Sequence, residues 1–400
     1  MADDAAGGAA NRATDDEVDH GDWIRLSHPD IGAPEMAAVL ALMPTSRLSQ
    51  GPAAEAFERR FAKFVGRAHA VAVSSGTAGL MITLRALGIG PGDEVIASGY
   101  SWHQIAHAIV LVGAKPVFAE IDYWSGTLTA DKAALKIGAR TKAILAGNTN
   151  GHPAPWQGLR ELTRKHELIL IEDSTEAIGS IYQGKPVGSF GDCALFDFSQ
   201  PSALACGEGG MILTDDPALA AELRYLRSHG LDDRLSVSVG SRVPCQARMS
   251  DLHATLGLAQ LDRIDEILAR RKVVEAHYTR HIQSFEGIKP PYRAPDVDQI
   301  HWLVYLVHLG TRFTRSARNQ IIDDLRTEKI EVAAYCNPLH LQFAYARFDC
   351  AKGNLPVTEK IADRGLALPF HAHLSDEEVM FLVATAKDAS INVGAGAAIY

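Results

Sequence analysis

A short segment of small and hydroxylated residues, SSGTAGL at 74–80, has the composition of an anion-binding turn. It lies between a predicted strand and the start of a predicted helix, where free backbone N–H groups and the positive helix end attract negative charge. We therefore expect Ser75, Gly76 and Thr77 to face an anion such as phosphate. An ordinary strand-to-helix turn is the competing interpretation of the same residues.

Two further positions with useful chemistry follow predicted strands. Trp102, in SWHQ, offers a flat ring that could stack on a heterocycle, and a core or interface tryptophan is the equal alternative. Asp173, in IEDST, ends the most apolar strand of the chain. A carboxylate there is costly without a cationic partner, and a protonated pyridine nitrogen is such a partner.

The elements that must hold these residues indicate an α/β fold. From about Phe57 onward, apolar runs of strand length alternate with longer amphipathic stretches, which is typical of βα units around a mainly parallel sheet. We expect strands at 68–74, 93–99, 115–122, 142–148, 168–174, 193–199 and 209–216. Helices are expected between them, including 77–88 and 156–166.

The pattern changes after Ser250, a plausible N-cap for one long helix over 251–282. A strand at 301–309, a helix near 315–328 and a last helix near 376–390 then predict a smaller α+β domain. The expected organisation is an acidic tail over 1–25, a large α/β domain over 26–262, and a small C-terminal domain over 263–400 that includes the linking helix.

Composition narrows the function. The chain has 400 residues, of which 47% are hydrophobic, so a large core in two or three domains is expected. A net charge of −9 argues against a nucleic-acid partner. No apolar run approaches the ~20 residues that span a bilayer, and no signal peptide is evident. The five cysteines show neither CxxC nor zinc-like spacing, which favours reduced thiols in the cytoplasm and no metal site.

Taken in order, SGTA, an aromatic residue after the next strand, an acidic IED strand end and GEGGMILTDD form a specific set. This set closely resembles the DegT/DnrJ/EryC1/StrS family of sugar and aminocyclitol aminotransferases, and the likeness extends from Arg47 to Leu374. The resemblance implies fold type I of the pyridoxal phosphate (PLP) enzymes, similar to aspartate aminotransferase. It also implies a sugar or aminocyclitol substrate, PLP or pyridoxamine phosphate (PMP) as cofactor, and a homodimer whose RMSD segment, 248–251, lies near the partner's cofactor.

The same resemblance exposes departures that cluster at the cofactor. Aligned on GEGG, the family's Schiff-base lysine falls on Ser202, and the serine that usually touches the cofactor phosphate falls on Asp197. A glutamine near the cofactor ring becomes Glu176, and the partner subunit's asparagine becomes Gln246. No lysine occurs between Lys185 and Lys272. A hydroxyl cannot form an imine, so any cofactor is expected to bind without a covalent link.

Four functions remain open from the sequence. The first is a lysine-free enzyme with bound PMP or PLP, related to dehydratases, in which His103, His152 or His229 supplies acid/base catalysis beside Ser202. The second is cofactor-free acid/base chemistry on a cationic or polyhydroxylated substrate, for which Asp197 and Glu176 make the pocket acidic. The third is a non-catalytic partner subunit of an active aminotransferase. Conventional PLP transamination is the fourth. Each histidine also fits a structural, hydrogen-bonded role.

Overall fold

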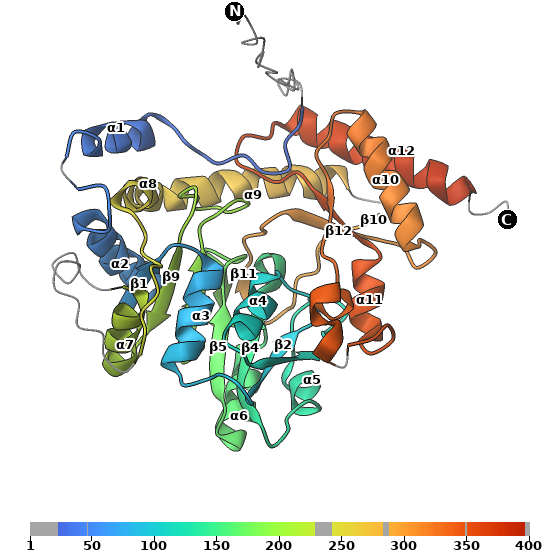
Figure 1. Cartoon of the computed structure of the whole chain (residues 1–400). Coiled ribbons are helices and arrows are strands. Elements are labelled where there is room, and N and C mark those ends of the chain that lie inside the picture. The colour runs from blue at the N-terminus through green and yellow to red at the C-terminus, as the bar shows by residue number, and fades with distance from the viewer. Residues whose placement is uncertain (1–22, 46, 229–241, 283–287, 349, 397–400) are drawn as a thin grey trace, which may run out of the picture.

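The computed structural model describes residues 23–45, 47–228, 242–282, 288–348 and 350–396 (Figure 1). Its centre is a seven-stranded sheet with the order β1-β9-β8-β5-β4-β2-β3. The five strands from β8 to β3 run parallel, and β9 is antiparallel to both β1 and β8. The strands span His69–Val73 (β1), Glu94–Ser98 (β2), Lys115–Ala119 (β3), Thr141–Gly147 (β4), Ile169–Asp173 (β5), Cys193–Asp197 (β8) and Gly210–Thr214 (β9). All seven predicted strands are confirmed.

Helices cover both faces of this sheet. Successive side chains of each strand point to opposite faces, and both faces are apolar. In β1, Val71 and Val73 join one core cluster, and Ala70 and Ala72 join another. The first face is covered by α3 (Gly76–Ala86), α4 (Gln104–Leu111) and α7 (Pro217–Arg227). The second is covered by α2 (Pro52–Val65), α8 (Asp251–Asp262) and α6 (Trp156–His166), with α5 (Ala130–Ala134) beside α6. The predicted α/β architecture is therefore present.

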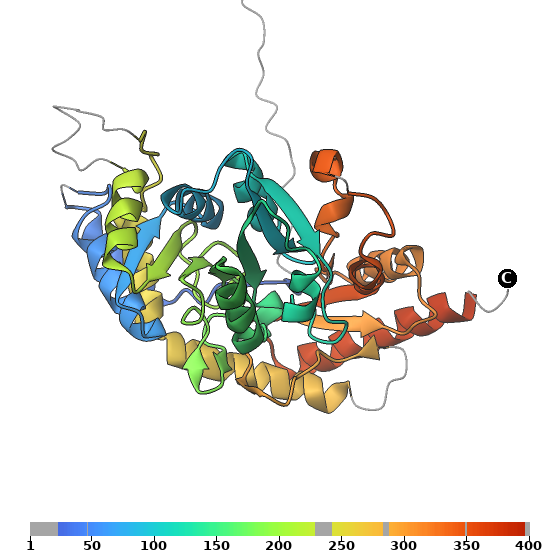
Figure 2. The ribbon, with the colours of Figure 1, turned by 90° about the horizontal axis from the view of Figure 1, so that it is seen from below.

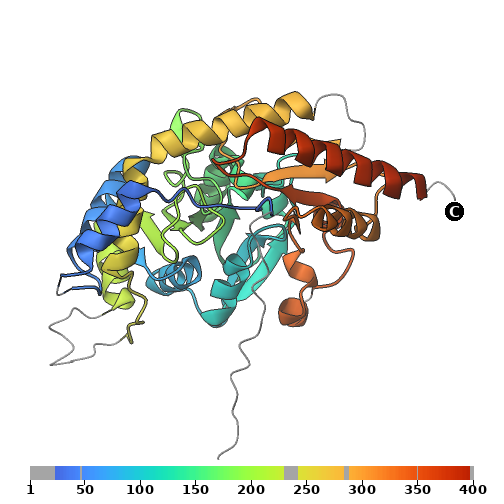
Figure 3. The same cartoon turned by 90° about the horizontal axis from the view of Figure 1, so that it is seen from above.

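The C-terminal part forms a smaller α+β unit at one side of the central sheet (Figure 2). Its antiparallel sheet has the order β10-β12-β14-β13. These strands span Ile288–Lys289 (β10), Tyr305–Leu309 (β12), Ala333–Ala334 (β13) and Gly365–Leu368 (β14). The helices are α9 (Ile264–His281), α10 (Arg315–Thr327), α11 (Pro356–Ala362) and α12 (Asp376–Gly396), and α9 packs along α12 (Figure 3).

A small third sheet, with the order β11-β6-β7, pairs Val297–Gln299 (β11), Ile181–Tyr182 (β6) and Lys185–Pro186 (β7).

Two sequence expectations are corrected. The long helix predicted over 251–282 is two helices, α8 and α9, that meet at Arg263, whose backbone (φ −110°, ψ 8°) departs from helical geometry. The Arg263 side chain bonds Glu35, in the first turn of α1 (Ala33–Leu42), and Asp30, in the segment that leads into this helix. The predicted N-cap is confirmed, because the Ser250 hydroxyl accepts a hydrogen bond from the His253 N–H.

The predicted strand 301–309 begins only at Tyr305. Two of the earlier N–H groups bond the large domain instead: His301 donates to the Ser180 hydroxyl and Val304 to the Asn150 side chain. A backbone donor that is already used cannot join a strand ladder, so these residues connect the two parts of the molecule.

The amino-terminal segment also reaches the C-terminal part. Ile24 forms a β-bridge with Ile330, and the Leu26 N–H donates to the Glu331 carboxylate. Residues 1–22 of the predicted tail lie outside the described residues, and the domain boundaries stay a prediction. No helix within the described ranges is long and apolar enough to cross a membrane.

Candidate functional site at the sheet edge

The predicted anion turn has the geometry of a helix start. It follows β1 at the edge of the sheet where the parallel strands β5 and β8 end. Gly76 is the first residue of α3, and Ser75 is its N-cap, whose hydroxyl accepts from the Ala78 N–H at 3.2 Å. The backbone N–H of Gly76 therefore points out of the helix and needs an acceptor from elsewhere.

Asp197 supplies that acceptor. This last residue of β8 is buried, and its Oδ2 accepts a hydrogen bond from the Gly76 N–H at 2.6 Å. Its Oδ1 accepts from the N–H and the hydroxyl of Ser199. A Cβ atom on residue 76 would lie 2.6 Å from Asp197 Oδ2 and 2.6 Å from Gln104 Oε1, so a larger residue here would force these side chains to move. The sequence placed Asp197 near an anion, but in the structure Asp197 is itself the anion at the turn.

Asp173, at the end of β5, is also satisfied by protein groups. Gln104 Nε2 donates to its Oδ2 at 3.0 Å, and the Thr175 N–H donates to its Oδ1 at 3.1 Å. Burial raises the pKa of this carboxyl and the charge of Asp197 adds to the increase, while the hydrogen bonds from Thr175 and Gln104 oppose it. Gln104 thus bonds the acidic end of β5 and lies beside the first residue of α3. Sequence reasoning did not select it, although it stands two residues after Trp102 in the SWHQ motif.

Trp102 and His103 lie together just before α4. Their rings stack with centroids 5.3 Å apart, and the His103 ring is 4.8 Å from that of His107. The stacking partner that the structure gives Trp102 is therefore a histidine of the chain itself. Burial and the neighbouring His107 lower the pKa of His103, and the charge of Asp197 acts in the opposite direction. A neutral imidazole can accept a proton near neutral pH.

Glu176 follows the end of β5 by three residues, is 8% exposed, and bonds Tyr335 of the C-terminal part. Its Oε2 accepts from the Tyr335 hydroxyl and the Asn150 N–H, while its Oε1 has no hydrogen-bond partner among the described residues. Burial raises the pKa of Glu176 to about 7. Tyr335 was not found from the sequence, because it is 159 residues away and carries no motif.

Ser202 lies in the loop that joins β8 to β9, and its side chain is buried. The hydroxyl donates to the Leu204 carbonyl at 2.8 Å and accepts from the Leu204 N–H at 3.2 Å. The loop is closed by hydrogen bonds from the Cys206 N–H to the Phe198 carbonyl and from the Phe198 N–H to the Gly209 carbonyl. The described hydrogen bonds of Ser202 stay within this loop, so Asp197 rather than Ser202 contacts the anion turn.

The other predicted residues lie apart from this network. His152 is buried and bonds backbone groups through both ring nitrogens: Nδ1 contacts the Pro153 carbonyl at 2.8 Å, and Nε2 accepts from the Ala294 N–H at 3.2 Å. Burial lowers its pKa, so it has the features of a neutral packing residue. Gln246 is exposed next to Ala247, whose carbonyl accepts from the Ser74 N–H. His229 lies outside the described residues.

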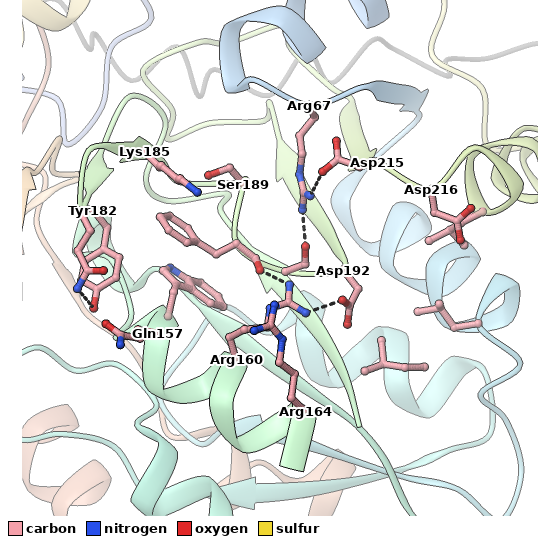
Figure 4. Close-up of a pocket in the computed structure, with 17 residues that line it drawn as sticks. Arg67, Gln157, Arg160, Arg164, Tyr182, Lys185, Ser189, Asp192, Asp215 and Asp216 are labelled. Carbon is pink, nitrogen blue, oxygen red and sulfur yellow. Dashed lines mark hydrogen bonds and ion pairs between the residues drawn. The ribbon is translucent and has the colours of Figure 1, made fainter. Parts of the chain in front are cut away.

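A groove of about 720 Å³ opens at the opposite edge of the sheet, where β5 and β8 begin (Figure 4). Two of its arginines are already paired, Arg67 with Asp215 and Arg160 with Asp192. None of the residues selected from the sequence lines this groove. Across the described ranges, no cluster of His, Cys, Asp and Glu side chains has the arrangement of a metal site.

Comparisons with known proteins agree with this fold. Residues 29–386 match the model of the DegT/DnrJ/EryC1/StrS aminotransferase family. The chain is 36% identical to the GDP-perosamine synthase of Caulobacter vibrioides over 363 residues, which covers 90% of this chain and 96% of that protein. It is 33% identical to the spore coat polysaccharide biosynthesis protein SpsC of Bacillus subtilis over 379 residues, or 92% of this chain and 97% of the relative.

Solved structures give the same result. A putative sugar aminotransferase from Streptococcus pneumoniae, solved in its PMP form, superposes with a TM-score of 0.88 at 27% identity over 93% of this chain and 99% of the other. The aminotransferase TlmJ from Streptoalloteichus hindustanus superposes with a TM-score of 0.85 at 31% identity, again over 93% of this chain and 100% of the other.

Proposed function

Since this chain belongs to the DegT/DnrJ/EryC1/StrS aminotransferase family, we propose that it acts on a keto or amino sugar in the biosynthesis of an amino sugar. The names of its relatives support this substrate class: one makes GDP-perosamine, another serves a spore coat polysaccharide, and a third is a putative sugar aminotransferase. An aminocyclitol is the alternative substrate that the sequence left open.

The relatives also bear on the reaction. Sequence reasoning ranked conventional transamination last, yet the relatives' names favour it over an altered chemistry, and solved members are in PMP and PLP forms. Conventional transamination is therefore the first candidate for the reaction. When bound, pyridoxal phosphate supplies an electron sink that allows an amino group to be exchanged on a carbon.

The residues present do not fit a cofactor tethered through a Schiff base. An imine requires a primary amine, and position 202 carries a hydroxyl whose hydrogen bonds are used within its own loop. The Gly76 N–H, which an anionic group would need, is bonded to Asp197. This observation favours a second candidate: chemistry on the sugar without a lysine-bound cofactor, either with non-covalent PMP or PLP or with none.

Protein groups of this chain could move protons in the second candidate. Glu176, with its pKa of about 7, can both donate and accept a proton near neutral pH, and its Oε1 has no partner among the described residues. His103 is exposed, and its lowered pKa keeps the ring neutral as a base. Dehydration or isomerisation of a sugar requires one group that donates a proton and another that accepts a proton.

The two reactions are separated by one experiment on the purified full chain. Absorbance is recorded with added PLP or PMP, before and after borohydride, and a nucleotide-linked keto sugar is then supplied with an amino-acid donor. A borohydride-trapped adduct together with release of a 2-oxo acid would establish transamination. Sugar turnover without either signal would establish the second candidate. Absence of sugar binding, with copurification of a lysine-bearing relative, would instead support the partner-subunit function.

A homodimer is also part of the proposal, and a heterodimer with an active aminotransferase is its alternative. Helix α1 supports it, because Met36, Leu40 and Met43 are 56%, 70% and 51% exposed, and their spacing places them on one face. Exposed apolar residues grouped in this way are typical of a subunit interface.

A further inference from the structure

The first residue of α3 already holds an anion, and that anion belongs to the protein. A helix N-terminus favours a negative charge, since its first N–H groups lack partners within the helix and the helix dipole is positive there. Here the Asp197 carboxylate takes the Gly76 N–H at 2.6 Å. The contact joins residues 121 positions apart, so it arises from the tertiary fold and not from local capping.

The carboxylate is fixed in this position. Asp197 is 7% exposed, and its second oxygen accepts two hydrogen bonds from Ser199. Asp197 Oδ2 and Gln104 Oε1 each lie 2.6 Å from where a Cβ of residue 76 would be, so side chains already pack closely around the first residue of the helix. A buried carboxylate held by this many donors is costly to displace.

The second predicted anchoring point, Asp173, also bonds protein groups. Asp173 is the residue that we expected from the sequence to pair with a protonated pyridine nitrogen. Its Oδ2 accepts from Gln104 and its Oδ1 from the Thr175 N–H. Gln104 Nε2 donates to the Thr175 hydroxyl at 2.9 Å as well. Protein donors therefore contact the acidic groups at both ends of the position that a phosphate-bearing ring would occupy, although each Asp173 oxygen keeps a lone pair beyond these bonds.

We propose that Asp197 is a built-in anion that occupies the phosphate position at the start of α3, so that the wild-type site excludes phosphate-bearing cofactors. A phosphate would compete for a donor that is already used, and it would meet a like charge in a poorly screened site. The site is then suited to a neutral or cationic ligand, such as a sugar that carries an ammonium group. This inference favours the cofactor-free form of the second candidate reaction over transamination, and it does not depend on the sugar substrate proposed above.

The test measures binding of PMP by calorimetry, without any sugar. PMP carries the phosphate but no aldehyde, so its binding does not depend on an amine at position 202. Asp197→Ser removes the charge, and we expect its Kd for PMP to be at least about tenfold lower than that of the wild type. Pyridoxamine, which has no phosphate, should show no such gain.

Two further variants complete the design. Asp216→Ser makes the same change at the N-cap of α7, where Asp216 accepts from the Ala218 N–H, and should leave PMP binding at the wild-type level. Asp197→Asn keeps the side-chain shape and should also gain affinity, which covers the case in which Asp197→Ser does not fold. The proposal is overturned if wild-type protein binds PMP as tightly as either variant at position 197, because a carboxylate that blocks the site cannot leave the affinity unchanged.

Discussion

Glu176 is a buried residue whose proton affinity links stability to pH. Its ordinary pKa is 4.5, and burial raises it to about 7 in the folded protein. Between these two values the folded chain binds more protons at this position than the unfolded chain does. Because stability falls with rising pH wherever the folded state binds more protons, Glu176 lowers the free energy of unfolding as pH rises through this range.

Replacing Glu176 with glutamine removes this titration. Relative to the wild type, we expect the free energy of unfolding of Glu176→Gln to increase between about pH 4.5 and pH 7, by up to about 3 kcal/mol. Urea unfolding at several pH values measures the difference. Glu328→Gln, at an exposed position, is the control. Wild-type and Glu176→Gln curves that stay parallel across this range would contradict the assignment.

The chemistry of the candidate site depends mainly on residues 197 and 202. The type of residue at 202, a serine, is visible in the sequence, and it argues against an imine. The contact of Asp197 with Gly76 is not visible there, because charge alone predicts only that Asp197 would repel a phosphate. The Asp197 carboxylate could either lie opposite a bound phosphate or take the place of that phosphate at the helix start. Only the structure gives the position of the carboxylate and so distinguishes the two.

Strand β5 shows how one element organises the loops around it. Glu172 is fully buried, and its carboxylate accepts from the backbone N–H groups of Gly188, Phe190 and Gly191 at 2.5, 2.9 and 3.1 Å. It also accepts from the side chain of Asn148, at the end of β4. One acidic side chain thus satisfies a loop that leads from β7 into β8, and thereby positions the strand that ends at Asp197.

Glu172→Gln should therefore destabilise the protein strongly. The amide keeps one acceptor oxygen but turns an NH₂ group toward N–H donors, which leaves buried donors unpaired. We expect a loss of about 3 kcal/mol or more in the free energy of unfolding, measured with urea. Glu161→Gln, at an exposed position on the adjacent helix α6, should change it by less than about 0.5 kcal/mol. Equal stabilities of the two variants would refute this account of the loop.

At the scale of the whole molecule, the subunit assembly is the property with the clearest test. Met36 and Leu40 extend from α1 and are largely exposed in the single chain. If this face is the dimer interface, the double variant Met36→Glu, Leu40→Glu should run as a monomer near 43.1 kDa while the wild type has twice that mass. Light scattering during gel filtration measures both masses.

The control for this prediction is Met380→Glu, which places the same charge at a residue of α12 that is 52% exposed. It should leave the mass of the wild-type assembly unchanged. A wild-type protein that is monomeric at every concentration tested would exclude the homodimer, and a double variant of wild-type mass would move the interface elsewhere.

Local patterns were sufficient for the elements of the large domain. Strands such as 193–199 and helices such as 156–166 could be predicted because alternating or helical apolar spacing follows from which side of an element is buried. The same patterns were misleading at Arg263 and at 301–304. In both places contacts with a distant segment override the local preference: a side-chain network with Asp30 and Glu35 in one, and backbone bonds to Ser180 and Asn150 in the other.

The amino-acid sequence by itself determined the α/β fold, the family and the type of residue at positions 197 and 202, because these depend on local periodicity and on ordered motifs. Only the tertiary structure decided that Asp197 bonds Gly76, that Gln104 bonds Asp173 and that Tyr335 bonds Glu176. Each of these pairs joins residues between 69 and 159 positions apart. Such contacts depend on how strands and loops converge at one edge of the sheet, and no pattern of neighbouring residues encodes that convergence.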